Sequence, residues 1–322
     1  MKQLIYITGS GRSGSTLLDM LLNTNPDVAA LGEVHRFSMN IDSKEEAHKC
    51  TCGMPVAECR FWQDVIKKLK EKGVDPCSMQ TTWSWNSQVG IDADGINIEE
   101  KIAPSSFFQR INVFNIFMAA GFGSVAVKMA SFLSSFKRGK KVFEDSWLLY
   151  EAVSDVAGKN IIVDGTKSPG RLMGLAEINP KNIPVKVIYL CRDGRAVVHA
   201  RMKRQGVSVS KAAKIWRLEH LKIQRALRVS GLSFIKVKYE DLCANPDLVM
   251  KSIFEFSGTN SNEMDCNFRG GSHSLGGNPM RKRTNENEIV LNEKWRKELT
   301  CKELKIFNRV AEGINEGLGY SS

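Results

Sequence analysis

The sequence contains no long, uninterrupted hydrophobic segment. Its most apolar window, residues 113–133, is broken by Asn115, Gly121, Gly123 and Lys128. A membrane span needs about 20 largely apolar residues, so we expect a buried helical hairpin there and no transmembrane span. The apolar stretch before the first glycine cluster is also too short for the core of a signal peptide.

A disulfide framework is missing as well. Of the eight cysteines only Cys50, Cys52 and Cys59 cluster, and Cys191 lies inside an apolar run. This scatter is typical of a reduced, intracellular chain, and we expect a cytoplasmic protein. With 42% hydrophobic and 25% charged residues over 322 positions, the chain has the composition of a folded protein rather than a disordered one.

Negative charge is in deficit. Lys and Arg number 46 against 35 Asp and Glu, which gives a formal net charge of +11. A surplus of this size attracts polyanions, which include nucleic acid, anionic membrane surfaces, and phosphorylated or sulfated small molecules. No recognisable nucleic-acid-binding module is present, so we expect no nucleic-acid partner.

Apolar runs that alternate with helical patterns predict the fold. Strand-like runs cover residues 4–8, 160–164, 185–191 and 232–239, and the last alternates polar and apolar residues as an edge strand does. Strands that alternate with helices indicate a parallel sheet. We predict an α/β protein with a P-loop-NTPase-like parallel sheet flanked by helices. Residues 1–322 would form a single domain, with a mostly helical insertion at 38–158 on the acceptor side.

A glycine-rich turn follows the first predicted strand. Residues 9–16, GSGRSGST, have the G-x-x-x-x-G frame of a nucleotide P-loop, and helical spacing begins at Thr16. Such loops direct backbone N–H groups at an anion, and the helix dipole adds to the attraction. The lysine of a Walker motif is absent because Ser15 stands in its place. Arg12 is the only cation in the loop.

The stretch GSGRSGSTLL resembles the 5′-phosphosulfate loop of sulfotransferases that use 3′-phosphoadenosine-5′-phosphosulfate (PAPS). The chain as a whole resembles the bacterial and tyrosylprotein branches of this family. A sulfuryl group in transfer carries less charge than a phosphoryl group, so the Walker lysine and magnesium are less needed. We expect no metal cofactor. The resemblance implies cofactor contacts from the residues of this loop: Gly11, Arg12, Ser13, Gly14, Ser15 and Thr16.

A second segment is similar to the same superfamily. Residues 187–199 form a strand that ends in R-D-G-R, and in this family the first arginine, here Arg192, binds the 3′-phosphate. Arginine suits a terminal phosphate through bidentate hydrogen bonds. The family usually places a serine eight residues later, and here that position is Ala200. Either the hydroxyl contact is lost or Ser208 or Ser210 supplies it.

Two further turns carry the resemblance. Residues 163–169, VDGTKSP, are similar to the family's Asp-x-[ST]-Lys-[ST]-Pro turn, whose lysine, here Lys167, reaches the phosphosulfate bridge. A solvated loop cation is the alternative. Residues 276–281, GGNPMR, resemble the loop that closes over the nucleotide, which implies contacts from Asn278 and Arg281.

The resemblance also suggests the catalytic base. A Gly-Glu pair in the related branches supplies the catalytic carboxylate, and Glu33 matches it within LGEVHR. Such a group takes the proton of the acceptor hydroxyl as sulfur is attacked in line. His35 is the competitor, because the cytosolic branches use a histidine. We favour Glu33, with Arg12 and Lys167 as its catalytic partners.

Cysteines and a histidine cluster in HKCTCGMPVAECRFW, residues 48–62. Three cysteines and one histidine bind zinc tetrahedrally, but Cys-x-Cys is an uncommon finger spacing and a second knuckle is missing. Packed thiols or a local disulfide are the alternatives to a metal site, and we favour them.

The predicted function is transfer of the sulfuryl group from PAPS to a hydroxyl acceptor. The acceptor class stays open among carbohydrate, peptide tyrosine, lipid and small alcohol, and so does the oligomeric state. A P-loop kinase with a degenerate Walker motif is one alternative, and the missing lysine argues against it. A non-catalytic protein that binds polyanions is the other.

Overall fold

A parallel sheet of five strands lies at the centre of the protein, in the order β2-β3-β1-β4-β5. The computed structural model describes residues 1–45, 48–82, 122–129, 134–259, 268, 272–282 and 288–321. The strands are β1 (Gln3–Gly9), β2 (Val28–Ala30), β3 (Ile161–Lys167), β4 (Val185–Cys191) and β5 (Phe234–Lys238). All four strands expected from the sequence are present, and β5 is an edge strand as predicted.

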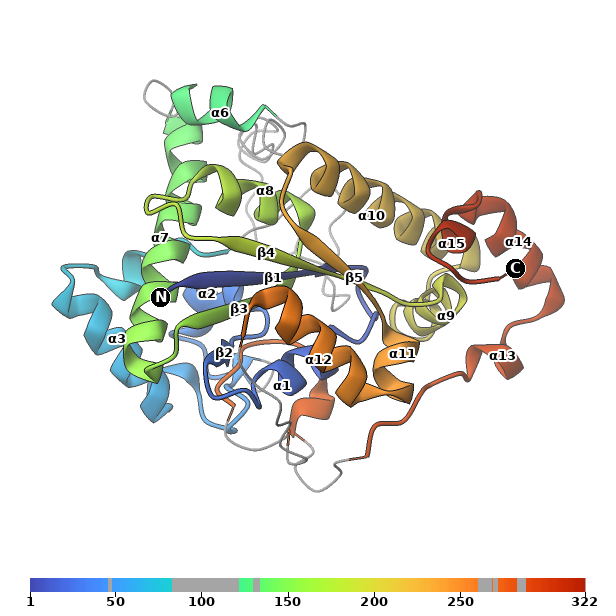
Figure 1. Cartoon of the computed structure of the whole chain (residues 1–322), viewed down its shortest axis with the longest axis horizontal. Helices are drawn as coiled ribbons and strands as arrows, with labels where there is room; N and C mark the ends of the chain where they lie inside the picture. The colour runs from blue at the N-terminus through green and yellow to red at the C-terminus, as the bar shows by residue number, and fades with distance from the viewer. Residues whose placement is uncertain are drawn as a thin grey trace.

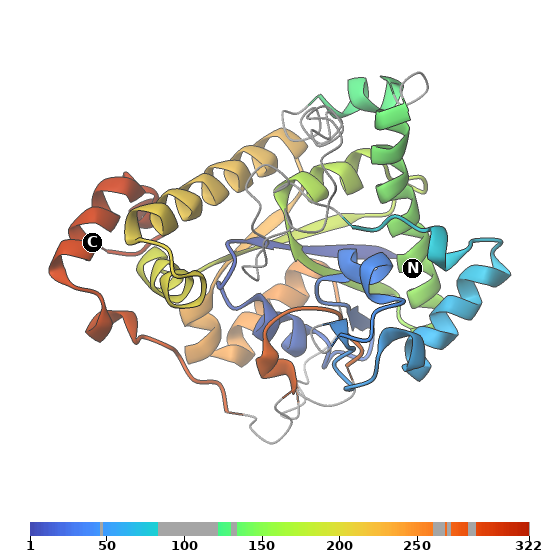
Figure 2. The same cartoon turned by 180° about the vertical axis from the view of Figure 1, so that it is seen from behind.

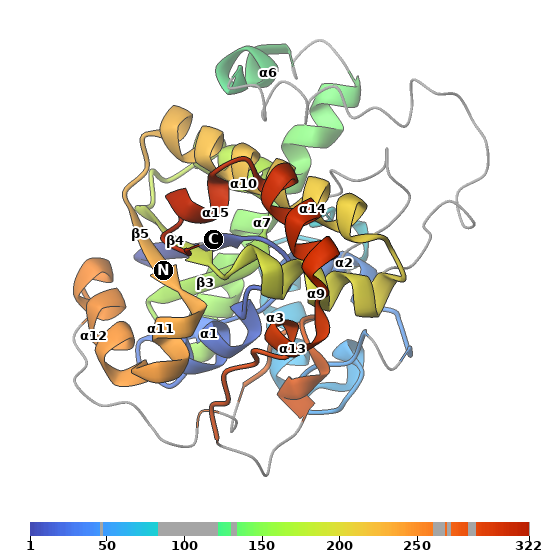
Figure 3. The same cartoon turned by 90° about the vertical axis from the view of Figure 1, so that its right-hand side faces the viewer.

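Helices cover both faces of this sheet. In Figure 1 α1, α11 and α12 lie on one face, and α8 and α10 lie on the other. The view in Figure 3 shows the same two layers from the side. The helices are α1 (Ser15–Leu22), α2 (Phe37–Asn40), α3 (Arg60–Glu71), α6 (Gly123–Met129), α7 (Ser134–Ala157), α8 (Pro169–Glu177), α9 (Gly194–Gln205), α10 (Val209–Ser230), α11 (Tyr239–Ala244), α12 (Pro246–Ser257), α13 (Trp295–Glu298), α14 (Cys301–Ala311) and α15 (Ile314–Gly317).

The central strand explains why both layers form. Side chains of successive strand residues point to opposite faces, and in β1 both sets are apolar. Leu4 and Tyr6 join the core under α7, α8 and α10, whereas Ile5 and Ile7 join the core under α1 and α12. A strand of this kind is stable only when helices cover it on both sides.

The predicted insertion is partly visible. Within 38–158 the described residues include α3, α6 and α7 and no strand. Most of the hairpin predicted at 113–133 falls outside the described residues, and α6 is the part that falls within them. No helix in the described part of the chain combines the length and the apolarity of a membrane span.

The sheet order brings the predicted functional segments to one edge. β3 lies on one side of β1 and β4 on the other, so a topological switch point lies between β1 and β4. Ligands of open α/β sheets bind at such points, beyond the carboxyl ends of the strands. Figure 2 shows this arrangement from behind, with the two termini at opposite ends of the molecule.

Candidate active site

The glycine-rich turn joins β1 to α1 in a shape that its residues fix. Gly14 has a φ of 92°, and a Cβ there would lie 2.2 Å from the ring of Tyr239, so only glycine fits. The Ser13 hydroxyl donates to the Ser10 carbonyl oxygen at 2.7 Å, which closes the turn. The turn therefore ends at the amino terminus of α1, where backbone amides and the helix dipole favour an anion.

Arg12 and Lys167 share an unusual backbone conformation. Their φ values are 75° and 74°, in the left-handed region. For a residue other than glycine this conformation costs of order 1–3 kcal/mol and persists only where the surroundings impose it. It places both predicted catalytic cations at the carboxyl ends of adjacent strands. The Thr8 hydroxyl donates to the Lys167 carbonyl at 2.9 Å, which joins the two segments.

The predicted base and the predicted bridge lysine are in direct contact. Lys167 Nζ lies 2.6 Å from Glu33 Oε1, and Arg36 Nε donates to Glu33 Oε2 at 3.0 Å. Glu33 is only 8% exposed, and its backbone N–H donates to the Leu275 carbonyl. Two cations therefore hold the carboxylate in one orientation.

These cations decide the ionisation of Glu33. Burial alone would raise the pKa of this carboxyl, but Lys167 and Arg36 together hold it well below its ordinary value. Glu33 is thus ionised at neutral pH. Burial lowers the pKa of His35 to about 3, so this imidazole is neutral, and its Nδ1 lies 3.1 Å from the Thr166 hydroxyl.

Arg192 connects β4 to the glycine-rich turn. Its guanidinium donates to the Arg12 carbonyl at 3.0 Å and to the Asn292 carbonyl at 2.8 Å. It also stacks over the Tyr239 ring, with 4.4 Å from Cζ to the ring centroid. Its Nε is buried and has no hydrogen-bond partner among the described residues. Arg192 is therefore fixed beside the turn and retains an unused donor.

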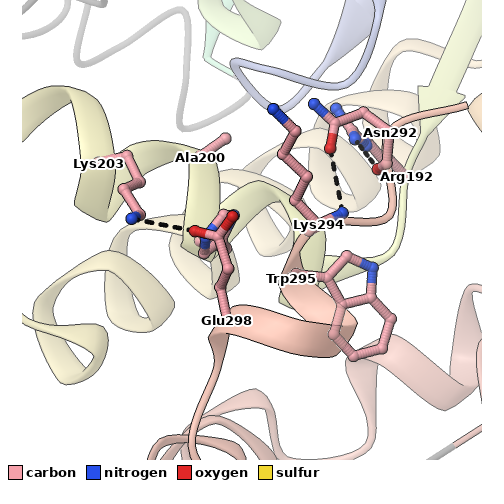
Figure 4. A pocket seen from close by; sticks show the side chains of 9 residues that line it. Arg192, Ala200, Lys203, Asn292, Lys294, Trp295 and Glu298 are labelled. Carbon is pink, nitrogen blue, oxygen red and sulfur yellow. Dashed lines mark hydrogen bonds and ion pairs between the residues drawn. The ribbon is translucent and has the colours of Figure 1, made fainter. Parts of the chain in front are cut away.

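Arg192 and Ala200 line the same pocket, which has a volume of about 340 Å³. Figure 4 shows this pocket with Lys203, Lys294 and Trp295 around it. Neither serine that we considered as a substitute for the missing hydroxyl lines it, and Ser208 instead caps α10 by accepting from Lys211 N.

The sequence did not identify two further cations of this pocket, Lys203 and Lys294. Lys203 follows Ala200 by about one helical turn, a spacing that could have identified it. Lys294 lies in the carboxyl-terminal tail, where no motif marked it. Lys203 Nζ and His199 Nε2 both lie 3.0 Å from Glu298, which partly balances the charge of Lys203.

The loop of residues 276–281 lies against the glycine-rich turn and Glu33. Asn278 N donates to the Thr16 hydroxyl at 3.1 Å, which places this loop at the start of α1. Arg281 is 6% exposed, and its guanidinium forms an ion pair with Asp19 at 3.1 Å. The structure thus brings Asn278 to the turn, whereas Arg281 is engaged by a buried carboxylate that the sequence did not identify.

A buried ion pair supports the turn that carries Lys167. Arg171 Nε donates to Asp164 Oδ2 at 3.0 Å, and both side chains are almost fully buried. Tyr150 also donates to Asp164, and Arg171 donates to the Thr81 carbonyl and the Ser146 hydroxyl. Asp164 also accepts from the backbone N–H of Thr166. This network fixes Thr166, the residue that precedes Lys167.

The cysteine cluster contains a different histidine from the one expected. Cys50, Cys52 and Cys59 are free thiols, so the local disulfide is not formed. Their sulfur atoms and one nitrogen of His273 all lie within 4.8 Å of one another. His48, next to the cysteines in sequence, instead places Nδ1 2.7 Å from the Ser43 hydroxyl.

Several solved structures are similar to this chain in their fold. The sulfotransferase domain of the Synechococcus PCC 7002 olefin synthase superposes with a TM-score of 0.54 at 17% identity, over 99% of this chain and 95% of that one. The sulfotransferase domain from the curacin biosynthetic pathway gives 0.49 at 16% identity, over 98% of both chains. STF9 from Mycobacterium avium gives 0.48 at 14%, over 99% and 77%.

The first of these superpositions confirms the predicted fold. None of the curated proteins is similar enough to the chain to count as a match. The model of the sulfotransferase family matches residues 4–263, which is most of the sequence. With the glycine-rich turn, Glu33, Lys167 and Arg192 meeting at one edge of the sheet, the chain belongs to the sulfotransferase family.

Proposed function

We propose that this sulfotransferase moves the sulfuryl group from PAPS to a hydroxyl acceptor. The observation that carries the proposal is the contact of Arg192 with the Arg12 carbonyl, at 3.0 Å. This contact joins the glycine-rich turn, which would bind one phosphate, to the pocket of Arg192, which would bind another. The two lie on either side of the switch point between β1 and β4. A nucleotide that bears phosphate groups at both its 5′ and 3′ ends matches two linked anion sites.

The residues around Arg192 fit a 3′-phosphate. Its buried Nε has no protein partner among the described residues, and Lys203 and Lys294 line the same pocket. The amides from Gly11 to Thr16 would hold the 5′-phosphosulfate together with Arg12. Asn278, beside Thr16, would lie at the same end, and Arg281 would act by holding this loop through Asp19.

Glu33 would take the acceptor proton in an in-line transfer. The bond from the acceptor oxygen to sulfur forms as the bond from sulfur to the bridging phosphate oxygen breaks, and the hydroxyl proton passes to Glu33. Lys167 and Arg12 stabilise the charge that develops on the leaving phosphate. No step of this scheme needs a metal ion.

The contact between Lys167 and Glu33 gives the mechanism an order. While the Glu33 carboxylate is paired with Lys167, its pKa is lowered and it is a weak base. A donor that draws the Lys167 ammonium to its bridging oxygen removes this cation, so the pKa of Glu33 rises and the carboxylate can accept a proton. The base is thereby activated after the donor has bound.

The acceptor would enter from the side of residues 38–158, which we propose as the acceptor-side part of a single domain. Carbohydrate, peptide tyrosine, lipid and small alcohol all remain candidate acceptors. We propose a cytoplasmic location because the cysteines at seven described positions are free thiols.

Arg192→Ala is expected to weaken binding of 3′-phosphoadenosine-5′-phosphate roughly ten- to a hundred-fold. Loss of a charge-assisted hydrogen bond costs about 1.5–3 kcal/mol. Isothermal titration with this ligand and with adenosine 5′-phosphate separates the 3′ contact from any general disturbance. Arg195→Ala is the matched control, because Arg195 is engaged by Asp193. Equal losses for both ligands would remove Arg192 from the 3′-phosphate role.

Ala200→Ser is expected to tighten the same ligand by up to about tenfold, because it adds one hydroxyl to the pocket of Arg192. Affinity for adenosine 5′-phosphate should stay unchanged. An unchanged or weaker affinity for the 3′-phosphorylated ligand would mean that Lys203 or Lys294 already satisfies the phosphate.

A further inference from the structure

Four metal-ligating groups converge away from the proposed transfer site. Cys50, Cys52 and Cys59 come from the turn before α3, and His273 comes from a segment more than 200 residues later. Cys59 Sγ lies 3.3 Å and Cys50 Sγ 3.6 Å from His273 Nδ1. Cys52 Sγ lies 3.5 Å from Cys59 Sγ.

These distances match the edges of a zinc tetrahedron. Zinc binds thiolate sulfur at about 2.3 Å and imidazole nitrogen at about 2.0–2.1 Å. Tetrahedral angles then separate two sulfurs by about 3.8 Å and a sulfur from a nitrogen by about 3.6 Å. Each of these three contacts lies close to the corresponding edge, and all four ligand atoms lie within 4.8 Å of one another. A disulfide would need sulfurs about 2.05 Å apart.

Backbone hydrogen bonds and a ring contact hold these groups in place. Cys50 N donates to the Met54 carbonyl and Gly53 N to the Cys50 carbonyl, both at 2.9 Å, in a tight turn where Gly53 has a φ of 89°. The Phe61 ring stacks on the His273 imidazole, with centroids 4.9 Å apart and an interplanar angle of 8°. Thiols are weak hydrogen-bond donors, so hydrogen bonding alone gives little reason for three thiols and an imidazole to converge.

The cluster also has a consequence for the proposed transfer site. Thr51 N donates to the Ser274 carbonyl, and Ser274 N donates to the Thr51 hydroxyl, next to His273. One residue further, Leu275 accepts from the backbone N–H of Glu33. An ion bound by the cysteines and His273 would thus fasten the segment 272–282, which holds the backbone of Glu33.

We propose that Cys50, Cys52, Cys59 and His273 bind a structural Zn²⁺ ion that ties residues 50–59 to the segment 272–282. Soft thiolates with one imidazole in tetrahedral geometry select zinc among the common divalent ions. Four protein ligands close the coordination sphere, so the ion has no open position for chemistry. The transfer reaction itself still needs no metal.

The test measures zinc in the full-length protein, purified without chelator and reloaded with Zn²⁺ before gel filtration. Elemental analysis should give about one zinc per chain. Replacement by Co²⁺ should give the intense ligand-field absorption of a tetrahedral site and a thiolate-to-cobalt charge-transfer band. His273→Ala and Cys52→Ser should each weaken metal binding more than the 10–100-fold that loss of an outer-shell partner costs.

Matched controls come from groups that lie near the cluster in sequence but outside it. His48→Ala and Cys77→Ser should keep full zinc content, since neither belongs to the cluster. His273→Cys should keep the metal with a shifted cobalt spectrum, which separates loss of a ligand from failure to fold. A reloaded protein without zinc would overturn the proposal. So would a disulfide between Cys52 and Cys59 by intact mass, or unchanged zinc affinity in His273→Ala.

Discussion

Glu33→Gln is expected to lower the rate of sulfuryl transfer by roughly 10²–10⁴-fold, the usual contribution of a positioned general base. The amide keeps the size of the side chain and can still accept from Lys167 or Arg36, which contact the carboxylate at 2.6 and 3.0 Å. Nucleotide affinity should therefore change little. Single-turnover measurements with a saturating donor would separate the chemical step from binding.

His35→Asn provides the comparison. His35 is neutral and lies beside the Thr166 hydroxyl, so its replacement should have a comparatively mild effect. If Glu33→Gln retained near-normal turnover with chemistry rate-limiting while His35→Asn abolished it, the histidine would be the base. A large loss of nucleotide affinity in Glu33→Gln would instead show that Glu33 acts mainly by holding Lys167.

Arg171→Met is expected to lower the free energy of unfolding by about 3–5 kcal/mol, the usual cost of breaking a buried ion pair from one side. Arg171 is fully buried and is the cation paired with Asp164. Removing it leaves a buried carboxylate without its counter-charge. Urea unfolding followed by circular dichroism would measure the loss.

Arg217→Met is the matched control, because Arg217 pairs with the exposed Glu312. An exposed pair contributes about 0–1 kcal/mol, so the two variants should differ severalfold in lost stability. Equal losses would mean that the Asp164 network is not a main support of the fold. Transfer activity of the folded Arg171→Met protein should also fall, since the network positions the residues before Lys167.

Local sequence patterns predicted the sheet well. β4 spans the predicted residues 185–191, because a fully buried parallel strand reads as one continuous apolar run. β3 extends beyond its predicted end at Asp164 to Lys167, because the register shifts after Tyr6 and Thr8 pairs with Lys167. The three residues of β2 are too few to show any period.

Long-range partners were harder to predict. Arginine is almost never fully buried unless it is paired. The burial of Arg171 depends on its pairing with Asp164, and nothing in the sequence next to Arg171 indicated that pairing. Arg281 was expected at the nucleotide and is paired with Asp19, far away in the chain. The signal lay in α1, where Asp19 is the one charged residue of the helix and, being buried, needs a partner. The roles assigned to the site residues remain predictions.

Tyr239 lies between the two halves of the proposed nucleotide site. One part of its ring fills the space that a Cβ on Gly14 would need, and the guanidinium of Arg192 stacks over the ring. A larger side chain at position 14 must therefore displace the ring on which the arginine stacks. Changes at these three positions cannot be additive. A chain that enlarges the side chain at position 14 must make room at position 239, and that second change alters the ring on which Arg192 stacks.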